Sequence, residues 1–314
     1  LKMSKVTEVD FSFCGLGSPA MQILSDYVRE ATAAVARLSL SGNFITGSRN
    51  DGSGVFPDWK HDLDLSGLTS LCDALLTLRN PIELDLSKCS LSVNGVNVVA
   101  KAISAGAALA SVNFSGNPLT GATFGIRGWE NIDSDLVGFI ALCSVLGKLN
   151  EVNLSDCHLG PASVAELAKV FSDADAAIAH LALGSNRIGD EAMISLLDVL
   201  KDVALISFDI ANTECGVSTA TKLAELLSEE TKFRAALNSV TIDSTGSRKL
   251  SGGSPDYASQ ERVDASGPRT YTLTVGEEKI DLSQKNLGVE DVDLVATWLK
   301  RPEVSAAIAH LALG

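Results

Sequence analysis

The chain has 314 residues, of which 46% are hydrophobic but only 5% aromatic, so we expect an aliphatic core. Such a length is long for one globular core and ordinary for an array of stacked repeats. The formal net charge of −14 argues against binding to nucleic acid, because phosphate backbones are repelled, and is compatible with a basic partner. No apolar run reaches about 18 residues, so we expect no membrane span.

One pattern recurs eight times along the chain, at a spacing of about 28 residues. The pattern has the form LxxLxLxx(N/C)xL, and its copies begin at Val6, Val35, Pro81, Leu109, Leu149, Ile178, Leu205 and Leu237. Another copy opens at Ile308 and is cut off after Gly314, which predicts that the array is truncated at its C-terminus.

Each copy predicts one rung of a stack, made of a strand, a turn and a helix. The alternating Leu-x-Leu forms a short strand with one buried face, and the Asn or Cys turns the chain and satisfies backbone groups. A helix then returns with apolar residues at helical spacing, such as Met193, Leu196, Leu197 and Leu200. One rung cannot bury its apolar side alone, so the rungs stack.

The alternation of Cys and Asn at the turn, the long rung and the full helix over residues 164–170 resemble the ribonuclease-inhibitor-like subfamily of leucine-rich repeats. The resemblance covers almost the whole chain outside three insertions. It implies an α/β horseshoe of about nine or ten rungs, with parallel strands on the concave face and helices on the convex face. We therefore expect one array over residues 1–314. Protein binding is the usual role of the subfamily, and its motif residues are structural.

An internal duplication is also visible. Residues 176–184 recur without change at residues 306–314, and the rung before each copy matches as well, at residues 152–160 and 280–288. This match suggests that a block of several rungs was duplicated.

Three insertions interrupt the period, at about residues 47–65, 120–133 and 246–275. The third opens with a Gly/Ser-rich stretch and holds no apolar helix, so we expect a mobile loop. The segment Ile280 to Leu282 is expected to open a rung. The alternative is a hairpin in which residues 270–275 pair across Gly276. Whether Leu63-Asp-Leu65 forms an irregular rung strand stays open.

The insertions hold most of the residues that usually anchor interfaces, which are aromatic residues and Arg. The candidate protein-binding residues are Phe56, Trp59, Phe124, Arg127, Trp129, Tyr257 and Tyr271. The alternative is that these side chains only cap exposed rung edges. The first two insertions start about 10 Å apart, at one strand spacing per rung, and could form one patch.

The outward strand positions predict a small, polar, mildly acidic concave face without aromatic residues. Its candidate residues are Glu8, Asp10, Glu83, Asp85, Glu151 and Asp209. Such a face could be a shallow docking site for a basic partner. The alternative is a solvated ladder of short side chains.

No chemistry for catalysis is recognisable. Cys14, Cys89 and Cys157 share the turn position on alternate rungs, about 10 Å apart. That is too far for a disulfide or a shared zinc ion. The four His residues are scattered, and no phosphate-binding, metalloprotease or nucleophile motif is present. We expect no catalytic residue, no cofactor and no metal site.

These observations predict a non-catalytic scaffold or binding module for another protein. The alternatives are a structural accessory subunit of a large assembly, and a regulator of a partner enzyme that acts as an inhibitor or a GTPase activator. Free thiols fit a reducing compartment, so we expect an intracellular, cytoplasmic protein, although a removed N-terminal signal stays open.

Overall fold

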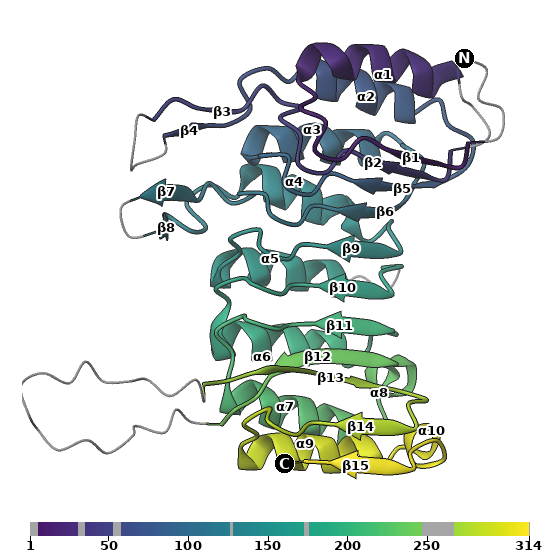
Figure 1. Cartoon of the computed structure of the whole chain (residues 1–314), viewed down its shortest axis with the longest axis vertical. Helices are drawn as coiled ribbons and strands as arrows, with labels where there is room; N and C mark the ends of the chain where they lie inside the picture. The colour runs from purple at the N-terminus through teal and green to yellow at the C-terminus, as the bar shows by residue number, and fades with distance from the viewer. Residues whose placement is uncertain are drawn as a thin grey trace, which may run out of the picture. The chain divides into compact units, whose positions relative to one another are not determined.

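The computed structural model describes residues 6–30, 35–52, 58–125, 128–172, 176–246 and 267–313. The chain divides into two compact units, Leu1–Ile188 and Gly189–Gly314, and each is described by itself. In both units short strands alternate with helices, and most of the described strand pairs are parallel (Figure 1). The expected α/β architecture of stacked strand–helix rungs is therefore present in each unit.

In the described part of unit 1, parallel strands follow one another in chain order within one sheet. They are β1 (Glu8–Asp10), β2 (Arg37–Ser39), β5 (Ile82–Asp85), β6 (Leu109–Asn113), β9 (Glu151–Asn153) and β10 (His180–Ala182). The central motif position is in register across the sheet and buried throughout, at Val9, Leu38, Leu84, Val112, Val152 and Leu181. The repeat pattern thus sets the strand register, because a slip by one residue would expose this apolar row.

Helices cover one side of this sheet (Figure 1). They are α1 (Ser18–Glu30), α2 (Ser66–Leu75), α3 (Val93–Ser104), α4 (Val137–Leu146) and α5 (Pro161–Phe171). Two glycines allow close approach within the pairs α1–α2 and α3–α4. A Cβ at Gly67 would overlap the carbonyl oxygen of Ser18, and a Cβ at Gly138 would overlap that of Val93. Helix pairing therefore depends on these two positions.

The motif Asn and Cys residues satisfy backbone groups inside the turns, as the sequence predicts. Buried Asn186 donates from Nδ2 to the carbonyls of Leu154 and Leu183, at 2.8 and 2.7 Å. Its Oδ1 accepts from the N–H groups of Cys157 and Leu159, at 3.0 and 2.9 Å. Each buried motif Asn thus links neighbouring turns, because an unpaired buried backbone group is costly.

Unit 2 also alternates strands with helices and adds two short helices, α8 and α10. Its elements are α6 (Gly189–Leu200), β11 (Ser207–Asp209), α7 (Val217–Ser228), α8 (Lys232–Ala236), β12 (Ser239–Asp243), β13 (Thr270–Thr274), β14 (Lys279–Asp281), α9 (Val289–Leu299), α10 (Pro302–Ser305) and β15 (His310–Ala312). Strands β11 and β12 are parallel, as are β14 and β15, whereas β13 is antiparallel to β12.

The structure decides between the alternatives that the sequence leaves open. Ile280 lies in β14 and pairs with Leu311 of β15, so the expected rung at residues 280–282 is confirmed. The alternative hairpin is wrong, because residues 270–274 pair with β12. The expectation of a mobile loop is therefore wrong for residues 270–274, which form a strand. Residues 247–266 of the same insertion lie outside the described part. Leu63 to Leu65 form no strand and lead into α2.

Candidate protein-binding surface

The first two insertions fold as antiparallel hairpins on unit 1. One consists of β3 (Arg49–Asn50) and β4 (Trp59–Lys60), the other of β7 (Thr123–Gly125) and β8 (Gly128–Glu130). Both project from the same side of the unit, where strands lead into helices (Figure 1). The two hairpins therefore lie along one edge of the unit. Whether they form one binding patch stays a prediction.

In the hairpin β3–β4, Trp59 contacts two other rings. Its ring centroid is 5.8 Å from that of Phe44 and 6.2 Å from that of His61. His61 Nδ1 in turn donates to the carbonyl oxygen of Ser90, at 3.2 Å, which ties this ring to the following rung. Trp59 is half-buried and Phe44 is 42% exposed, so the ring group presents apolar surface to solvent.

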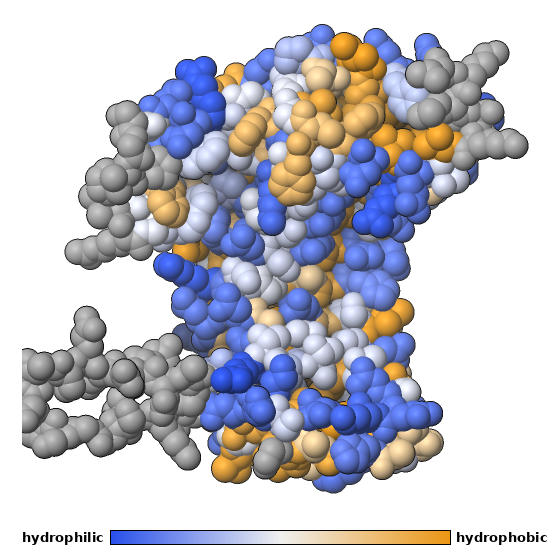
Figure 2. All heavy atoms as spheres, viewed as in Figure 1, coloured by the Kyte–Doolittle hydropathy of each residue, from blue (hydrophilic) through white to orange (hydrophobic). Residues whose placement is uncertain are grey.

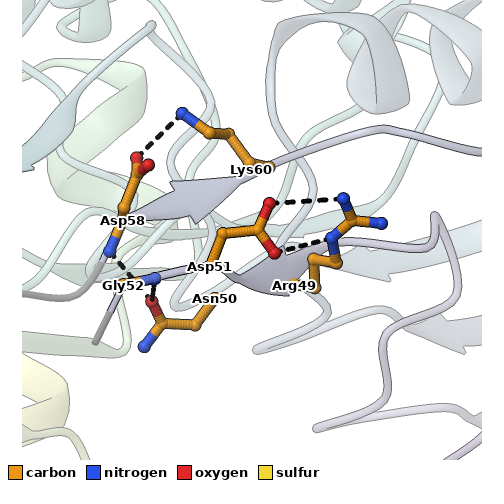
Figure 3. A network of polar contacts seen from close by, with 6 residues as sticks. All are labelled: Arg49, Asn50, Asp51, Gly52, Asp58 and Lys60. Atoms are coloured by element: carbon orange, nitrogen blue, oxygen red, sulfur yellow. Dashed lines mark hydrogen bonds and ion pairs between the residues drawn. The ribbon is translucent and has the colours of Figure 1, made fainter. Parts of the chain in front are cut away.

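Polar contacts hold this hairpin in shape (Figure 3). Asn50 Oδ1 accepts from the N–H groups of Gly52 and Asp58, both at 2.9 Å. Arg49 pairs with Asp51 at 2.7 Å, and Lys60 pairs with Asp58 at 2.9 Å. Both ion pairs are exposed and contribute little stability, but they neutralise the two cations of the hairpin.

In the hairpin β7–β8, Trp129 also contacts one Phe and one His ring, at other distances and angles. Phe124 meets Trp129 edge to face, with ring centroids 5.5 Å apart and an angle of 84°. His158, from the following rung, stacks on Trp129 with centroids 3.8 Å apart and an angle of 28°. Burial lowers the pKa of His158, which favours its neutral form.

The two insertions are anchored by the same device. Each begins with Thr-Gly and ends with Asp-x-Asp-Leu, at residues 46–47 and 62–65 in one and at 120–121 and 133–136 in the other. The second Asp donates its N–H to the carbonyl of the Thr, from Asp64 to Thr46 at 2.8 Å and from Asp135 to Thr120 at 3.1 Å.

The first Asp of each motif caps the next helix of the array. Asp62 accepts from the N–H groups of Ser92 and Gly95 at the start of α3, at 3.1 and 2.7 Å. Asp133 accepts from Gly160, Ala162 and Ser163 at the start of α5, at 2.9 to 3.1 Å. A carboxylate at a helix N-terminus satisfies unpaired N–H groups and opposes the helix dipole.

We call the two ring groups together the edge surface. It consists of Phe44, Trp59, His61, Phe124, Trp129 and His158. Sequence reasoning placed Trp59, Phe124 and Trp129 in the insertions but missed Phe44 and both His residues. The duplicated Thr-Gly and Asp-x-Asp-Leu flanks were the signal that could have shown the two insertions to be equivalent.

Other candidates do not join the edge surface. Phe56, Arg127 and Tyr257 lie outside the described residues. Tyr271, expected as an exposed anchor, is 2% exposed, and its hydroxyl donates to buried Asp291 at 2.9 Å. Successive side chains of a strand point to opposite faces, and in β13 the face that holds Tyr271 is the buried one. Tyr271 is therefore a packing residue.

The outward strand positions of unit 1 form rows across the sheet. One row runs through Glu8, Arg37, Glu83, Ser111, Glu151 and His180. A hollow lies over its middle, lined by Arg37, Glu83, Asp85 and Glu151 among others. The group around this hollow holds Arg37 beside three carboxylates, and its role as a docking site for a basic partner stays a prediction.

The Asp candidates of the next row have a structural role that sequence reasoning missed. Asp10 and Asp85 each accept from the N–H two residues on, at Ser12 and Ser87, at 2.8 and 2.9 Å. In unit 2 Asp209 does the same to Ala211 at 3.0 Å, and burial raises its pKa. Such turns close the strand end and use one oxygen of each carboxylate.

Apolar surface is distributed unevenly over the molecule. Most of the face in Figure 2 is hydrophilic, and apolar colour gathers near the end of unit 1 that holds α1 and β1. Phe13, in the turn after β1, is 71% exposed. Its ring lies over Gly42, where a Cβ would overlap it, so Phe13 covers the second turn. Phe13 is therefore a packing residue despite its exposure.

Among the described residues, no three His, Cys, Asp or Glu side chains are grouped to hold a metal ion. The six cysteines are free thiols, with Cys14 exposed and four of the others buried. Within the same residues, no helix is both long and apolar enough to cross a membrane.

A family model described as Leucine Rich repeat matches residues 178–197, which supports a leucine-rich-repeat protein. Leucine-rich repeats are in general non-enzymatic modules for protein interaction, so the match suggests such a module here. A search of the curated proteins finds no match to the chain.

Proposed function

We propose that this chain is a non-catalytic scaffold that binds a partner protein through the edge surface of unit 1. The observation that carries the proposal is that each insertion places a Trp ring in contact with one Phe and one His ring, Trp59 with Phe44 and His61, and Trp129 with Phe124 and His158. Half-exposed Trp residues supported by neighbouring rings are typical anchors of protein interfaces.

The rigidity of the hairpins supports the same proposal. The backbone bonds at Thr46 and Thr120, and the helix caps by Asp62 and Asp133, fix both hairpins to the rungs that follow them. A preorganised surface loses little conformational entropy when it binds, so more of the contact energy appears as affinity.

The concave strand face is the second surface that we considered. Its Asp10 and Asp85 already use one oxygen each within their own turns, and its Ser41 and Ser87 hydroxyls pair with each other at 2.8 Å. Short polar side chains that already hydrogen-bond within the face, with no aromatic residue beside them, make few strong contacts with a partner. We therefore assign the partner to the edge surface, and place any acidic contribution of Glu83 and Glu151 second.

The alternation of Cys89, Asn117, Cys157 and Asn186 at the turns supports a finer classification. We infer that the array is of the ribonuclease-inhibitor-like type. The thiols of Cys89 and Cys157 donate to the carbonyls of Leu40 and Phe114 in the preceding rungs, at 3.1 and 3.2 Å. The side-chain amide of Asn186 donates to the equivalent carbonyl of its own preceding rung, that of Leu154. The two residue types thus serve one turn position on alternate rungs.

Affinity capture with the full chain tests the proposal. The bait is compared with Trp59→Ala, Trp129→Ala and the double variant, after crosslinking in extracts of the source cell. The matched control is Ile23→Ala, which removes an exposed apolar side chain from α1, 76% exposed. We expect the double variant to lose its specific partner and the control to retain it. Equal recovery by all baits, each with unchanged circular dichroism, would contradict the proposal.

A further inference from the structure

We propose that Trp59 and Trp129 bind one segment of the partner in the polyproline II conformation, rich in proline and flanked by basic residues. The inference rests on the proposed function, because it concerns the same edge surface. It adds the chemical class of the partner segment, which the position of the surface alone does not determine.

The first support is the kind of surface that the hairpins present. Each hairpin offers a half-buried Trp ring that contacts one Phe and one His ring, with 42% of Phe44 and 43% of Phe124 exposed. Proline rings pack on such aromatic faces, and a polyproline II segment has no internal hydrogen bonds to lose when it does. Because the segment is already extended, little conformational entropy is lost on binding.

The second support is a second Trp-centred ring group two rungs along the array. The strands β2 and β6, which precede the two insertions, are separated by β5, so their separation is about 10 Å. Neighbouring helices are spaced more widely, at about 8–10 Å, which gives about 20 Å for two rungs. The hairpins project from the connections between the strand layer and the helix layer, so we expect a separation between about 10 and 20 Å. A polyproline II segment covers this distance in three to six residues. One or two turns of the segment thus bring equivalent prolines to both Trp rings.

The third support is the charge beside the hairpins. Arg49 and Lys60 are already paired with Asp51 and Asp58. The exposed carboxylates Asp64, Glu130 and Asp135 form no ion pair with any residue that the structure describes. Asp64 and Asp135 each use one oxygen to accept from Ser66 and Val137, and Arg187 Nη1 donates to the carbonyl oxygen of Trp129 at 3.4 Å. With a second oxygen left on each Asp and a net charge of −14 for the chain, Lys or Arg beside the prolines would be favoured, more so near Trp59 than near Trp129.

Fluorescence anisotropy with labelled synthetic peptides tests the inference on the full chain. The probe carries prolines at every third position and two arginines at each end. One comparison peptide has alanine in place of every proline, and a second keeps the prolines with glutamates at the ends. Further peptides set two prolines three, four, five or six residues apart, to find the spacing that the two Trp rings select.

We expect the arginine-flanked proline peptide to bind, with affinity at least about ten-fold above that of the alanine peptide. Trp59→Ala and Trp129→Ala should each weaken binding by about ten-fold, and Ile23→Ala should leave it unchanged. Equal binding of the alanine peptide, or binding that survives the double Trp variant, overturns the inference.

The two proposals fail in different ways. If affinity capture depends on Trp59 and Trp129 but no proline peptide binds, the edge surface is the binding site and the polyproline class is wrong. Binding of a helical partner segment would be such a case. If capture does not depend on either Trp, the proposed function itself is wrong.

Discussion

His158 of the fifth rung stacks on Trp129 of the fourth-rung hairpin, with ring centroids 3.8 Å apart. The contact joins an insertion to the rung that follows it. His158 also offers its carbonyl oxygen to Thr120 Oγ1, at 2.8 Å, so both ends of the insertion are held at one residue. The position of Trp129 therefore depends on a side chain that lies outside its own hairpin.

This stack should make the stability of unit 1 depend on pH. Burial lowers the pKa of His158 below its ordinary value of about 6.5, so the unfolded chain takes up the proton more readily than the folded chain. We expect the free energy of unfolding to be fully retained above about pH 6.5, and to fall as the pH drops through that value toward the lower folded pKa. Urea unfolding from pH 8 to 5 measures the change. The variant His158→Gln should lack it; an unaltered pH profile in that variant would show that another group is responsible.

The buried motif Asn residues should be among the least replaceable side chains. In Asn186→Ala, the N–H groups of Cys157 and Leu159 and the carbonyls of Leu154 and Leu183 lose their partner together. Each unsatisfied buried group costs about 1–3 kcal/mol, so we expect a loss of about 3 kcal/mol or more. Chemical denaturation measures it. Asn150→Ala, at an exposed position, is the control and should change stability by less than about 0.5 kcal/mol. Similar losses in both variants would show that the buried hydrogen bonds contribute little.

Thiol reactivity should separate exposed from buried cysteines. Burial raises the pKa of Cys72, Cys89 and Cys143 to about 12, and it raises that of Cys157 as well. At pH 8 only about one in ten thousand of such thiols is ionised, and the ionised form is the one that reacts. We expect the native protein to show a fast phase from exposed Cys14 with a disulfide reagent, and the buried thiols to react only on unfolding. Cys14→Ser should remove the fast phase, and fast reaction of several thiols in that variant would contradict the described burial.

The repeat pattern predicted the strands, the helices and the turn residues correctly, because each rung follows from local periodicity. The buried row from Val9 to Leu181 and the turn contacts of Asn186 needed only the motif and its spacing. The favoured rung at Ile280 was predicted for the same reason, by its match to an ordinary rung. Where a segment repeats the motif, its fold is determined by its own sequence.

Segments without the motif could not be predicted from pattern alone. Residues 270–274 alternate apolar and polar side chains, which indicates a strand but not its partner, and the partner is β12 rather than β14. The sequence predicts an exposed anchor at Tyr271, because its hydrogen bond to Asp291, 20 residues further on, is not visible in the local pattern. Likewise His158 joins the edge surface through a contact between rungs, which no local pattern records.

Close pairing of α3 and α4 should depend on the absence of a side chain at Gly138. A Cβ there would overlap the carbonyl oxygen of Val93, a backbone atom that can move only with its helix. Alanine favours a helix over glycine by up to about 1 kcal/mol, but overpacking a close contact costs about 1–3 kcal/mol. We therefore expect Gly138→Ala to be destabilising by about 1–2 kcal/mol in urea unfolding. Gly147→Ala is the matched control, because Gly147 ends the same helix with φ of −57° and a Cβ there meets its nearest atom, Ala176 Cα, at 3.5 Å. That control should be neutral or slightly stabilising, since alanine restricts the unfolded chain. A Gly138→Ala variant as stable as Gly147→Ala would show that the helix pair can separate without loss, and that packing between α3 and α4 does not limit the stability of unit 1.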